Sequence, residues 1–363
     1  MECRAVIKYS VTVLYRRFSL KTAAVLFACT SLTLVCTACR MKKAAPARTF
    51  MAFDTVCTIN ACGAGNDALY DACEDRLAEL EQLFSAHIST SDICRVNNAA
   101  GVHPVPVSSE VMTVLLTARE YAEKSSGAFD PTIGPLVALW GIGTPDEHVP
   151  SDTEIAAARA LVNWKHLVLD EEAGTAFLEK AGMALDLGGI AKGFAADELV
   201  GLLKNAGVTS ALVDLGGNVY VLGGRPDESG SAVTGEAWRV GIKNPFKPEE
   251  GAGLRVDAAD MSVVTSGNYE RFFEADGVRY HHILDPKTGW PAENGFVSCT
   301  IIDSSSLIAD VLSTTVFVLG REEGIDFLEK DGKKGVCISS DGTVDVTDDM
   351  QTQVKTLSDD LRR

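Results

Sequence analysis

Chemically reactive side chains concentrate between Tyr280 and Pro291, a stretch that reads Tyr-His-His-Ile-Leu-Asp-Pro-Lys-Thr-Gly-Trp-Pro. His282 supplies an imidazole that can accept a proton near neutral pH, with His281 as a structural neighbour. Residues 285–289 have the composition of a turn, because proline presets φ and glycine accepts left-handed geometry. The stretch combines a candidate base with a rigid turn. An ordinary hairpin and a satisfied core histidine are the simpler alternatives.

A second reactive group follows downstream, where Asp310, Ser313 and Thr314 interrupt an apolar segment. Asp310 and Thr314 are four residues apart, so on a helix they share one face. A carboxylate buried in such a segment needs a partner, because an unpaired buried charge is costly. Mg²⁺ accepts carboxylate, hydroxyl and carbonyl oxygens, which makes a magnesium site one interpretation. A helix cap or a salt bridge is the alternative.

Paired glycines form a third candidate in Ala184–Asp197, which reads Ala-Leu-Asp-Leu-Gly-Gly-Ile-Ala-Lys-Gly-Phe-Ala-Ala-Asp. After a strand, Gly188 and Gly189 let the backbone approach a ligand, and a helix to about Asn205 would start beside an anion such as phosphate. Lys192 adds a positive charge there. The spacing matches neither the dinucleotide-binding nor the phosphate-loop fingerprint. A tight strand-to-helix connection is the simpler reading.

The Asp-Leu-Gly-Gly pattern recurs at Asp214–Gly217, followed by Asn218. A second glycine turn close to the first could complete a concave site. An ordinary hairpin turn is the interpretation that we favour, because the flanking residues are typical of strands.

Periodic segments indicate the elements that must position these residues. Apolar residues recur at helical spacing over 69–84 and 111–122. Short alternating or β-branched runs predict strands at 211–214, 219–222, 238–242, 262–265 and 297–302. Helices and strands intermingle without a regular βαβ order, which favours the α+β class.

No linker-like stretch divides the body of the chain, which indicates one large domain, with a two-lobed organisation as the alternative. We place this domain at residues 49–350 and treat residues 351–363 as a polar C-terminal tail.

The amino terminus resembles an export signal. Residues 1–38 contain a basic region followed by an apolar run that is short for a membrane-spanning helix. Val35-Cys36-Thr37-Ala38-Cys39 resembles a bacterial lipoprotein processing site, with Cys39 as the acylated residue and residues 39–48 as a membrane tether. A permanent amino-terminal anchor is the alternative. Both interpretations place the domain outside the cytoplasm, at the outer face of the cell membrane.

Charge and cysteine content narrow the function classes. Residues 1–38 carry five basic residues and one acidic residue, so the remaining chain has a net charge of −21 instead of −17. This acidity argues against nucleic acid or anionic lipid as the main partner. Six cysteines follow Cys39 without a CxxC pair, so we expect mostly buried free thiols and no zinc site, although disulfides are possible in an exported protein.

These motifs together resemble the ApbE family of FAD:protein FMN transferases. The resemblance runs from Phe50 to about Leu328, and its blocks occur in the family's order. The blocks are 51–55, 84–97, 127–132, 186–197, 265–271, 282–289 and 310–314. The resemblance implies a single T-fold-like domain with a mixed, largely antiparallel sheet core and flanking helices.

The resemblance also implies site roles, residue by residue. The FAD site would be lined by Met51, His87, Ala128, Phe129, Asp130, Asp186, Lys192 and Leu284. The metal, Mg²⁺, would be held by the Gly189 carbonyl with Asp310 and Thr314, and Ser313 would lie nearby. The family more often has Ala at the position of Gly189, and a backbone ligand tolerates that change.

The implied reaction moves the FMN moiety of FAD to a threonine or serine hydroxyl, forms a phosphoester and releases AMP. A hydroxyl is a poor nucleophile without a positioned base, and His282 is the candidate catalytic base. Two rivals differ in the fate of FAD. One is a magnesium-dependent pyrophosphatase that gives FMN and AMP, and the other is a flavin-binding surface lipoprotein without turnover.

Partners follow from the same resemblance. Acceptors of this family resemble a short Asp-x-x-[Ser/Thr]-Gly-Ala-Thr motif on exported electron-transfer proteins. The present chain contains no such motif, so we expect it to modify other exported proteins.

Overall fold

The structure is a computed structural model, and it describes residues 46–227, 231–233 and 235–363. From Ala44 onward the chain forms one compact unit. The predicted signal segment and Cys39 lie outside the described residues. Within the described ranges, no helix has both the length and the apolar character needed to cross a membrane.

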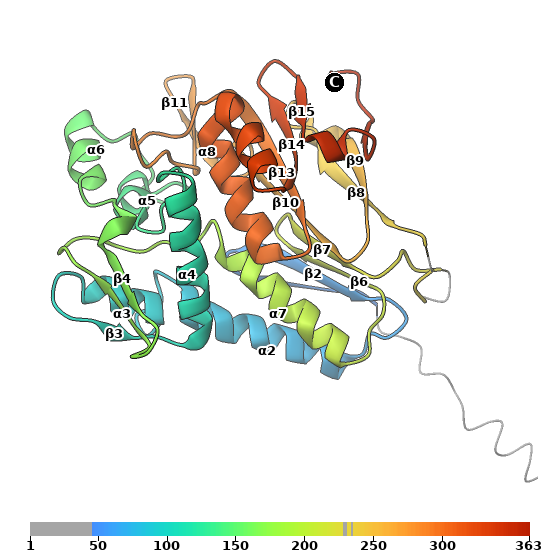
Figure 1. The fold of residues 1–363 in the computed structure, drawn as a ribbon, viewed down its shortest axis with the longest axis horizontal. Helices are drawn as coiled ribbons and strands as arrows, with labels where there is room; N and C mark the ends of the chain where they lie inside the picture. Colours follow the sequence, from blue (N-terminus) through green and yellow to red (C-terminus); the bar gives the residue numbers. More distant parts are fainter. Residues whose placement is uncertain (1–45, 228–230, 234) are drawn as a thin grey trace, which may run out of the picture. The chain divides into compact units, whose positions relative to one another are not determined.

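An eight-stranded sheet forms the centre of the described unit (Figure 1). Its strands run in the order β1 (Arg48–Ala52), β2 (Thr55–Ala61), β6 (Ala211–Leu215), β7 (Asn218–Leu222), β10 (Met261–Gly267), β13 (Phe296–Asp303), β14 (Lys334–Ser339) and β15 (Val344–Val346). Every neighbouring pair in it is antiparallel. The α+β class is confirmed, and four of the five predicted strands belong to this sheet.

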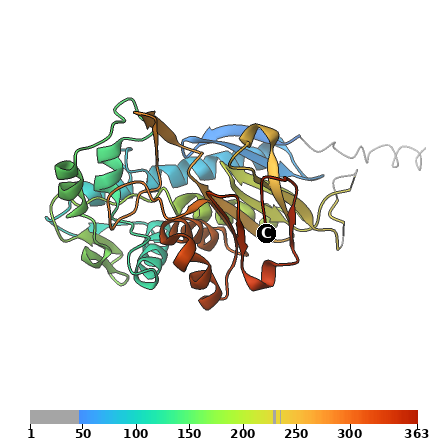
Figure 2. The ribbon, with the colours of Figure 1, turned by 90° about the horizontal axis from the view of Figure 1, so that it is seen from above.

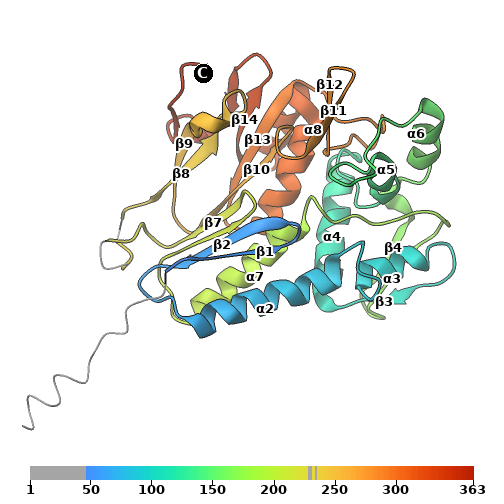
Figure 3. The same ribbon diagram turned by 180° about the vertical axis from the view of Figure 1, so that it is seen from behind.

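Helices cover one face of this sheet, as Figure 3 shows for α2 (Asp67–Phe84) and α7 (Ala191–Asn205), with α8 (Ser306–Lys330) beside α7. The predicted apolar stripe of α2 is buried, and Asn66 caps the helix by accepting from Leu69 N–H. Alternation along the strands sends Tyr220 and Leu222 toward these helices. This face carries the chemically interesting residues described below.

The other face of the sheet packs against a three-stranded sheet of β8 (Trp238–Lys243), β9 (Ala252–Ala258) and β16 (Val354–Thr356). Val221, between two helix-facing residues, lies in this second core. The expected boundary at residue 350 is too early, because β16 pairs with β9 and Leu361 is 4% exposed. The sequence of this segment does not indicate a strand, because a short edge strand needs few apolar residues.

The remaining elements gather at the end of the unit away from β8 and β9, as Figure 2 shows in cyan to green. They are α3 (Asp92–Asn98), β3 (Val105–Pro106), α4 (Ser109–Lys124), α5 (Gly134–Trp140), α6 (Asp152–Arg159), β4 (Leu167–Asp170) and β5 (Thr175–Leu178). A separate hairpin of β11 (Phe272–Ala275) and β12 (Val278–His281) contributes Phe273 and Tyr280 to an aromatic cluster around Trp140. Short 3₁₀ turns complete the described elements at Trp164–His166, Pro248–Glu250 and Asp348–Met350.

The cysteines of the described residues are all free thiols. Cys57, Cys73, Cys299 and Cys337 are buried. Burial raises the pKa of Cys57 and of Cys73 to about 11. These side chains act as small apolar core residues, as predicted.

Candidate active site

The first glycine turn, Asp186–Gly189, leads directly into α7. Asp186 Oδ1 accepts from Gly188 N–H at 2.9 Å, and Lys192 Nζ donates to the Gly188 carbonyl at 3.0 Å. Ile190, the residue before α7, gives the helix no side-chain cap. The segment before the turn is not the strand that we expected: Ala184 makes a single parallel bridge to Ile133. The turn therefore brings a lysine and a helix start together.

Asp310 meets this turn from α8, and it is 4% exposed. Its Oδ2 accepts from Gly193 N–H of α7 at 2.8 Å, so it caps another helix. The helix-cap alternative is thus partly correct. Burial raises the pKa of Asp310, and Lys192, Gly193 and Asn218 oppose that rise. A positive charge in addition to that of Lys192 would favour the ionised form of the Asp310 carboxylate.

Hydroxyl groups surround the same point. A Cβ built on Gly189 would lie 3.1 Å from Thr314 Oγ1, so the turn and α8 are in close contact. Ser266 Oγ of β10 lies 2.9 Å from Ser313 Oγ and 3.3 Å from Thr314 Oγ1. Ser313 Oγ–H donates to the Asp310 carbonyl at 2.9 Å. One carboxylate and several hydroxyls therefore converge beside the glycine turn.

This donor set fits a hard divalent cation such as Mg²⁺. The buried carboxylate of Asp310 has no charged side chain bonded to it among the described residues, and the Nδ2 of nearby Asn218 has no hydrogen-bond partner there. No group of three or more His, Cys, Asp or Glu side chains in the described ranges could hold a metal ion. A cation would therefore depend on mixed oxygen donors around Asp310 and Thr314.

His282 is held in one tautomer by the backbone. Its Nδ1 lies 3.1 Å from the Arg271 carbonyl, which can only accept, so Nδ1 carries the proton and Nε2 has the free lone pair. The side chain keeps partial solvent exposure, yet protein surrounds most of it. Burial lowers the pKa of His282 to about 3, with Arg271 and Lys192 also opposing protonation. His282 is therefore a neutral base at physiological pH.

Burial also lowers the pKa of His281, to about 4, but His281 has no free ring nitrogen. It is 3% exposed, its Nε2–H donates to the Ala292 carbonyl, and its Nδ1 accepts from Ile283 N–H. The His281 and Phe317 rings also pack in a T-shaped arrangement. Both nitrogens are used, so His281 is the structural neighbour that the sequence predicted.

The predicted turn after the histidines is present. Gly289 has φ 80°, and its N–H donates to the Asp285 carbonyl at 2.8 Å. Trp140 Nε1–H binds the Gly289 carbonyl and anchors the turn on α5.

The Ala128–Asp130 loop lies beside the first glycine turn. A Cβ on Gly189 would be 3.3 Å from the Phe129 ring, and Asp186 N–H donates to the Pro131 carbonyl. Asp130 accepts from Thr132 and from Trp164 N–H. Burial raises the pKa of Asp130 in spite of these bonds.

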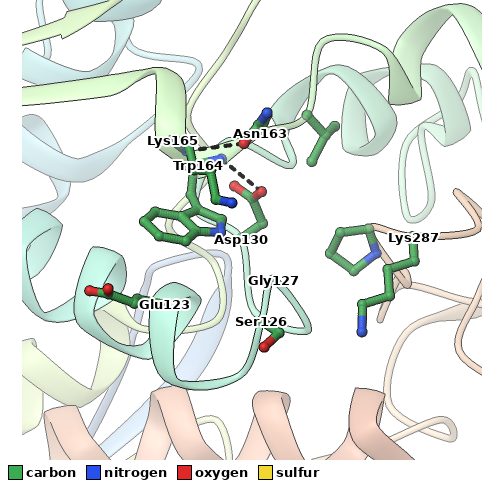
Figure 4. Close-up of a pocket in the computed structure, with 10 residues that line it drawn as sticks. Glu123, Ser126, Gly127, Asp130, Asn163, Trp164, Lys165 and Lys287 are labelled. Carbon is green, nitrogen blue, oxygen red and sulfur yellow. Dashed lines mark hydrogen bonds between the residues drawn. The ribbon is translucent and has the colours of Figure 1, made fainter.

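A cavity of about 460 Å³ adjoins this loop at Gly127 and Asp130 (Figure 4). Its lining includes Asp130, Trp164 and Lys165 on one side and Lys287 of the predicted turn on the other. The cavity thus joins two of the predicted motif blocks, 127–132 and 282–289, with residues 162–165 between them.

Three predicted flavin-site residues lie outside the group of residues around the first glycine turn and Asp310. Met51 lies on β1 with 68% of its surface exposed, opposite exposed Val56. His87 is exposed in the loop after α2. Leu284 is 7% exposed and packs with Trp140, so only its backbone could face a ligand.

Sequence reasoning missed two residues that the structure adds to the cluster, Asn218 and Ser266. Both lay inside noted motifs, yet neither residue type signals a site by itself. Trp164 and Lys165 of the cavity had no signal at all, because the contact with Asp130 spans distant parts of the chain.

A lysine at a helix start, buried oxygen donors and a neutral histidine are suited to an enzyme that acts on a phosphate anhydride. The sequence profile of the ApbE family matches residues 53–338, and the chain belongs to this family.

Several proteins are similar to this chain in sequence or in structure. The FAD:protein FMN transferase of Treponema pallidum is 43% identical over 260 residues, which cover 70% of this chain and 72% of the relative. That of Klebsiella pneumoniae is 39% identical over 259 residues, covering 71% and 78%. The solved apo structure of the Pseudomonas stutzeri flavinyl transferase ApbE has a TM-score of 0.72 at 32% identity, covering 85% of this chain and 96% of that one.

Proposed function

We propose that this protein is an FAD:protein FMN transferase that links FMN to a threonine or serine hydroxyl of an exported protein and releases AMP. The relatives that bear this name share up to 43% identity with the chain. The observation that carries the proposal is the arrangement at the start of α7, where Lys192, Gly189, Asp310 and Thr314 converge. His282 is close enough for Lys192 to lower its pKa.

In this reaction the acceptor oxygen attacks the phosphorus of the FMN half of FAD. The bond from that phosphorus to the bridging oxygen breaks, and AMP leaves with that oxygen. His282 Nε2 takes the proton of the acceptor hydroxyl, because Nδ1 is committed to the Arg271 carbonyl. Lys192 is suited to binding the pyrophosphate that gains negative charge as the bond breaks.

The Gly189 carbonyl, Asp310 and Thr314 would hold Mg²⁺, which when bound supplies charge neutralisation at the pyrophosphate. We assign the AMP half of FAD to the 460 Å³ cavity. Trp164 there offers a ring face for a base, and Lys165 and Lys287 offer positive charge (Figure 4). The flavin half would then extend toward Met51 and His87.

The setting of the reaction is part of the proposal. Cleavage and acylation at Cys39 would tether the domain to the outer face of the cell membrane, where acceptors with an Asp-x-x-[Ser/Thr]-Gly-Ala-Thr motif would reach it. The acidic surface is compatible with a protein partner that is itself not strongly acidic.

Intact mass spectrometry tests the proposal directly. The compact unit Ala44–Arg363 retains Arg48, which bonds Asp67 and Glu74 of α2, so it is a suitable enzyme fragment. Incubation with FAD, Mg²⁺ and an acceptor carrying Asp-x-x-Thr-Gly-Ala-Thr should add one FMN to the acceptor. EDTA, or replacement of the final threonine, should abolish the gain. AMP and free FMN without a modified acceptor would indicate a pyrophosphatase, and intact FAD would indicate a flavin-binding protein.

A further inference from the structure

The side-chain amide of Asn218 is a buried polar group that has no role in the proposed reaction. Asn218 is the first residue of β7 and is 1% exposed. Its Oδ1 accepts from Ser306 Oγ–H of α8 at 2.6 Å. Its Nδ2 has no hydrogen-bond partner among the described residues. Buried amide donors are rarely left unsatisfied, so the free N–H groups indicate a role.

The amide is oriented by a chain of hydroxyls. Ser262 Oγ of β10 lies 2.8 Å from Ser306 Oγ and 3.2 Å from the Val219 carbonyl, and Ser306 Oγ–H donates to Asn218 Oδ1. The Nδ2 end of Asn218 must then point away from Ser306. The opposite placement of the amide would turn its oxygen toward the Asp310 carboxylate, so that two acceptors would face each other.

The free N–H groups face Asp310. Asp310 follows Ser306 by one helical turn of α8, so a side chain bonded to Ser306 lies beside the carboxylate. Asn218 therefore lies on the same side of α8 as Asp310, although no hydrogen bond of ordinary length joins the two side chains. Gly193 N–H already occupies Asp310 Oδ2 from the α7 side. The carboxylate is therefore flanked by donors from α7 and from β7.

We propose that Asn218 is a positioning residue that holds the Asp310 carboxylate in the orientation needed to bind a divalent cation. The inference rests on the proposed function, in which Asp310 helps to hold Mg²⁺. Groups behind a metal ligand fix its orientation, and their loss typically weakens metal binding by about 10- to 100-fold. A neutral amide suits this position because it donates to the carboxylate without adding a charge.

The backbone explains how Asn218 reaches this position. The two-residue turn Gly216–Gly217 closes the β6–β7 hairpin, with Leu215 opposite Asn218. Asn218 shares the helix-covered face of β7 with Tyr220 and Leu222. The second glycine turn thus delivers an amide beneath the start of α8, and the hairpin acts on the site without contacting the substrate.

The test uses Asn218→Ala in the Ala44–Arg363 unit, with Asn244→Ala as a matched control. Asn244 is also 1% exposed, and its Nδ2 donates to Ser358 in a region remote from α8. Mn²⁺ binding is measured in the presence of FAD from the electron paramagnetic resonance signal of the free ion. Asn218→Ala should weaken binding about 10- to 100-fold, and Asn244→Ala should not. Excess Mg²⁺ should also restore FMN transfer by Asn218→Ala toward the parental rate.

Parental Mn²⁺ affinity in Asn218→Ala, or equal losses in both variants, would overturn the inference. Mn²⁺ binding that depends on Asn218 in a protein without transferase activity would support the inference and refute the proposed function. A parent that binds no Mn²⁺ would overturn both. If Asn218→Ala does not fold, Ser306→Ala replaces it, because loss of that hydroxyl frees the amide to rotate. Several-fold weaker binding would then support the inference, and parental binding would overturn it.

Discussion

Two turns of this protein share the sequence Asp-Leu-Gly-Gly and have different structures and tasks. The first, Asp186–Gly189, enters α7, and the second, Asp214–Gly217, closes the β6–β7 hairpin. In both, the aspartate accepts a hydrogen bond from a following glycine N–H. The residues after the tetrapeptide differ, with Ile-Ala-Lys-Gly-Phe in one case and the strand-forming Asn-Val-Tyr-Val in the other.

The glycines serve different physical needs in the two turns. Gly216 and Gly217 have φ of 65° and 91°, which is the left-handed geometry that a two-residue hairpin loop requires. Gly188 and Gly189 do not have positive φ, and Gly189 is instead close to Thr314 and Phe129. The second turn therefore requires left-handed geometry, with Gly216 also close to Thr55, whereas in the first turn only close approach calls for glycine.

The functional contrast is as clear as the structural one. The residue six positions after the aspartate is Lys192 in the first case and Tyr220 in the second. We therefore assign substrate contacts to the first turn, and to the second only the placement of Asn218.

The largest effect is expected at the base beside the first turn. His282→Gln should reduce FMN transfer about 10²- to 10⁴-fold, since the acceptor hydroxyl loses its proton acceptor. FAD binding, measured by equilibrium dialysis, should persist. Transfer rates come from acceptor mass shifts over time. Equal transfer rates in the variant and the parent would show that His282 is not the catalytic base.

The pH profile is the control for that assignment. The low pKa of His282, about 3, keeps the imidazole neutral from pH 8 down to pH 5. Protonation of the base should therefore cause no loss of rate in this window. A rate that halves near pH 6.5, the ordinary value for histidine, would contradict the buried environment seen here.

The next effect separates the two turns directly. Lys192→Met should lower kcat/KM for FAD by about 10²- to 10³-fold, the usual cost of removing one donor to developing negative charge. Tyr220→Phe, at the matching offset from the second turn, should leave kcat/KM unchanged. Steady-state AMP release with varied FAD measures both. Similar losses of kcat/KM in the two variants would mean that both turns contribute to the substrate site.

The helices, strands and turns that depend on local sequence patterns can be predicted from the sequence. The stripe of α2, the strands β6, β7, β8, β10 and β13, and the turn before Gly289 follow from periodicity and turn chemistry. The Asp310 and Thr314 pair was found because a carboxylate in an apolar helix is conspicuous. The family resemblance supplied most of the remaining candidates.

The rest depends on contacts between distant segments. Gly193 and Asp310 are 117 residues apart, and no local signal pairs them. The sequence does not indicate a role for Asn218 in the site, since an asparagine next to glycine is typical of any hairpin turn. β16 was missed because only Val354 of its three residues is buried. Long-range packing decides these features, and a single sequence does not display it.

A smaller effect concerns stability and the second turn. Gly216→Ala should destabilise the protein by about 2 kcal/mol, because its φ is left-handed and the new Cβ would meet Thr55 Oγ1. Gly217→Ala is the control, since its φ is also positive but no atom lies within 4 Å of the new Cβ. Urea denaturation followed by fluorescence measures both. A larger loss at Gly217 would mean that strain alone, without the Thr55 contact, decides tolerance.

The smallest effect is expected from Gly189→Ala, the same substitution in the first turn. Its φ is compatible with alanine, and the gain of about 0.4–1 kcal/mol from a less flexible unfolded chain opposes the tight contacts of the new Cβ. Those contacts, at 3.1 Å from Thr314 Oγ1 and 3.3 Å from the Phe129 ring, require small shifts of side chains only. The metal ligand proposed at residue 189 is the backbone carbonyl, which alanine retains, and a shift of a few tenths of an ångström relieves the contact with Thr314. Stability and FMN transfer should both stay near parental values, and a loss as large as that of Gly216→Ala would show that the first turn also depends on glycine geometry.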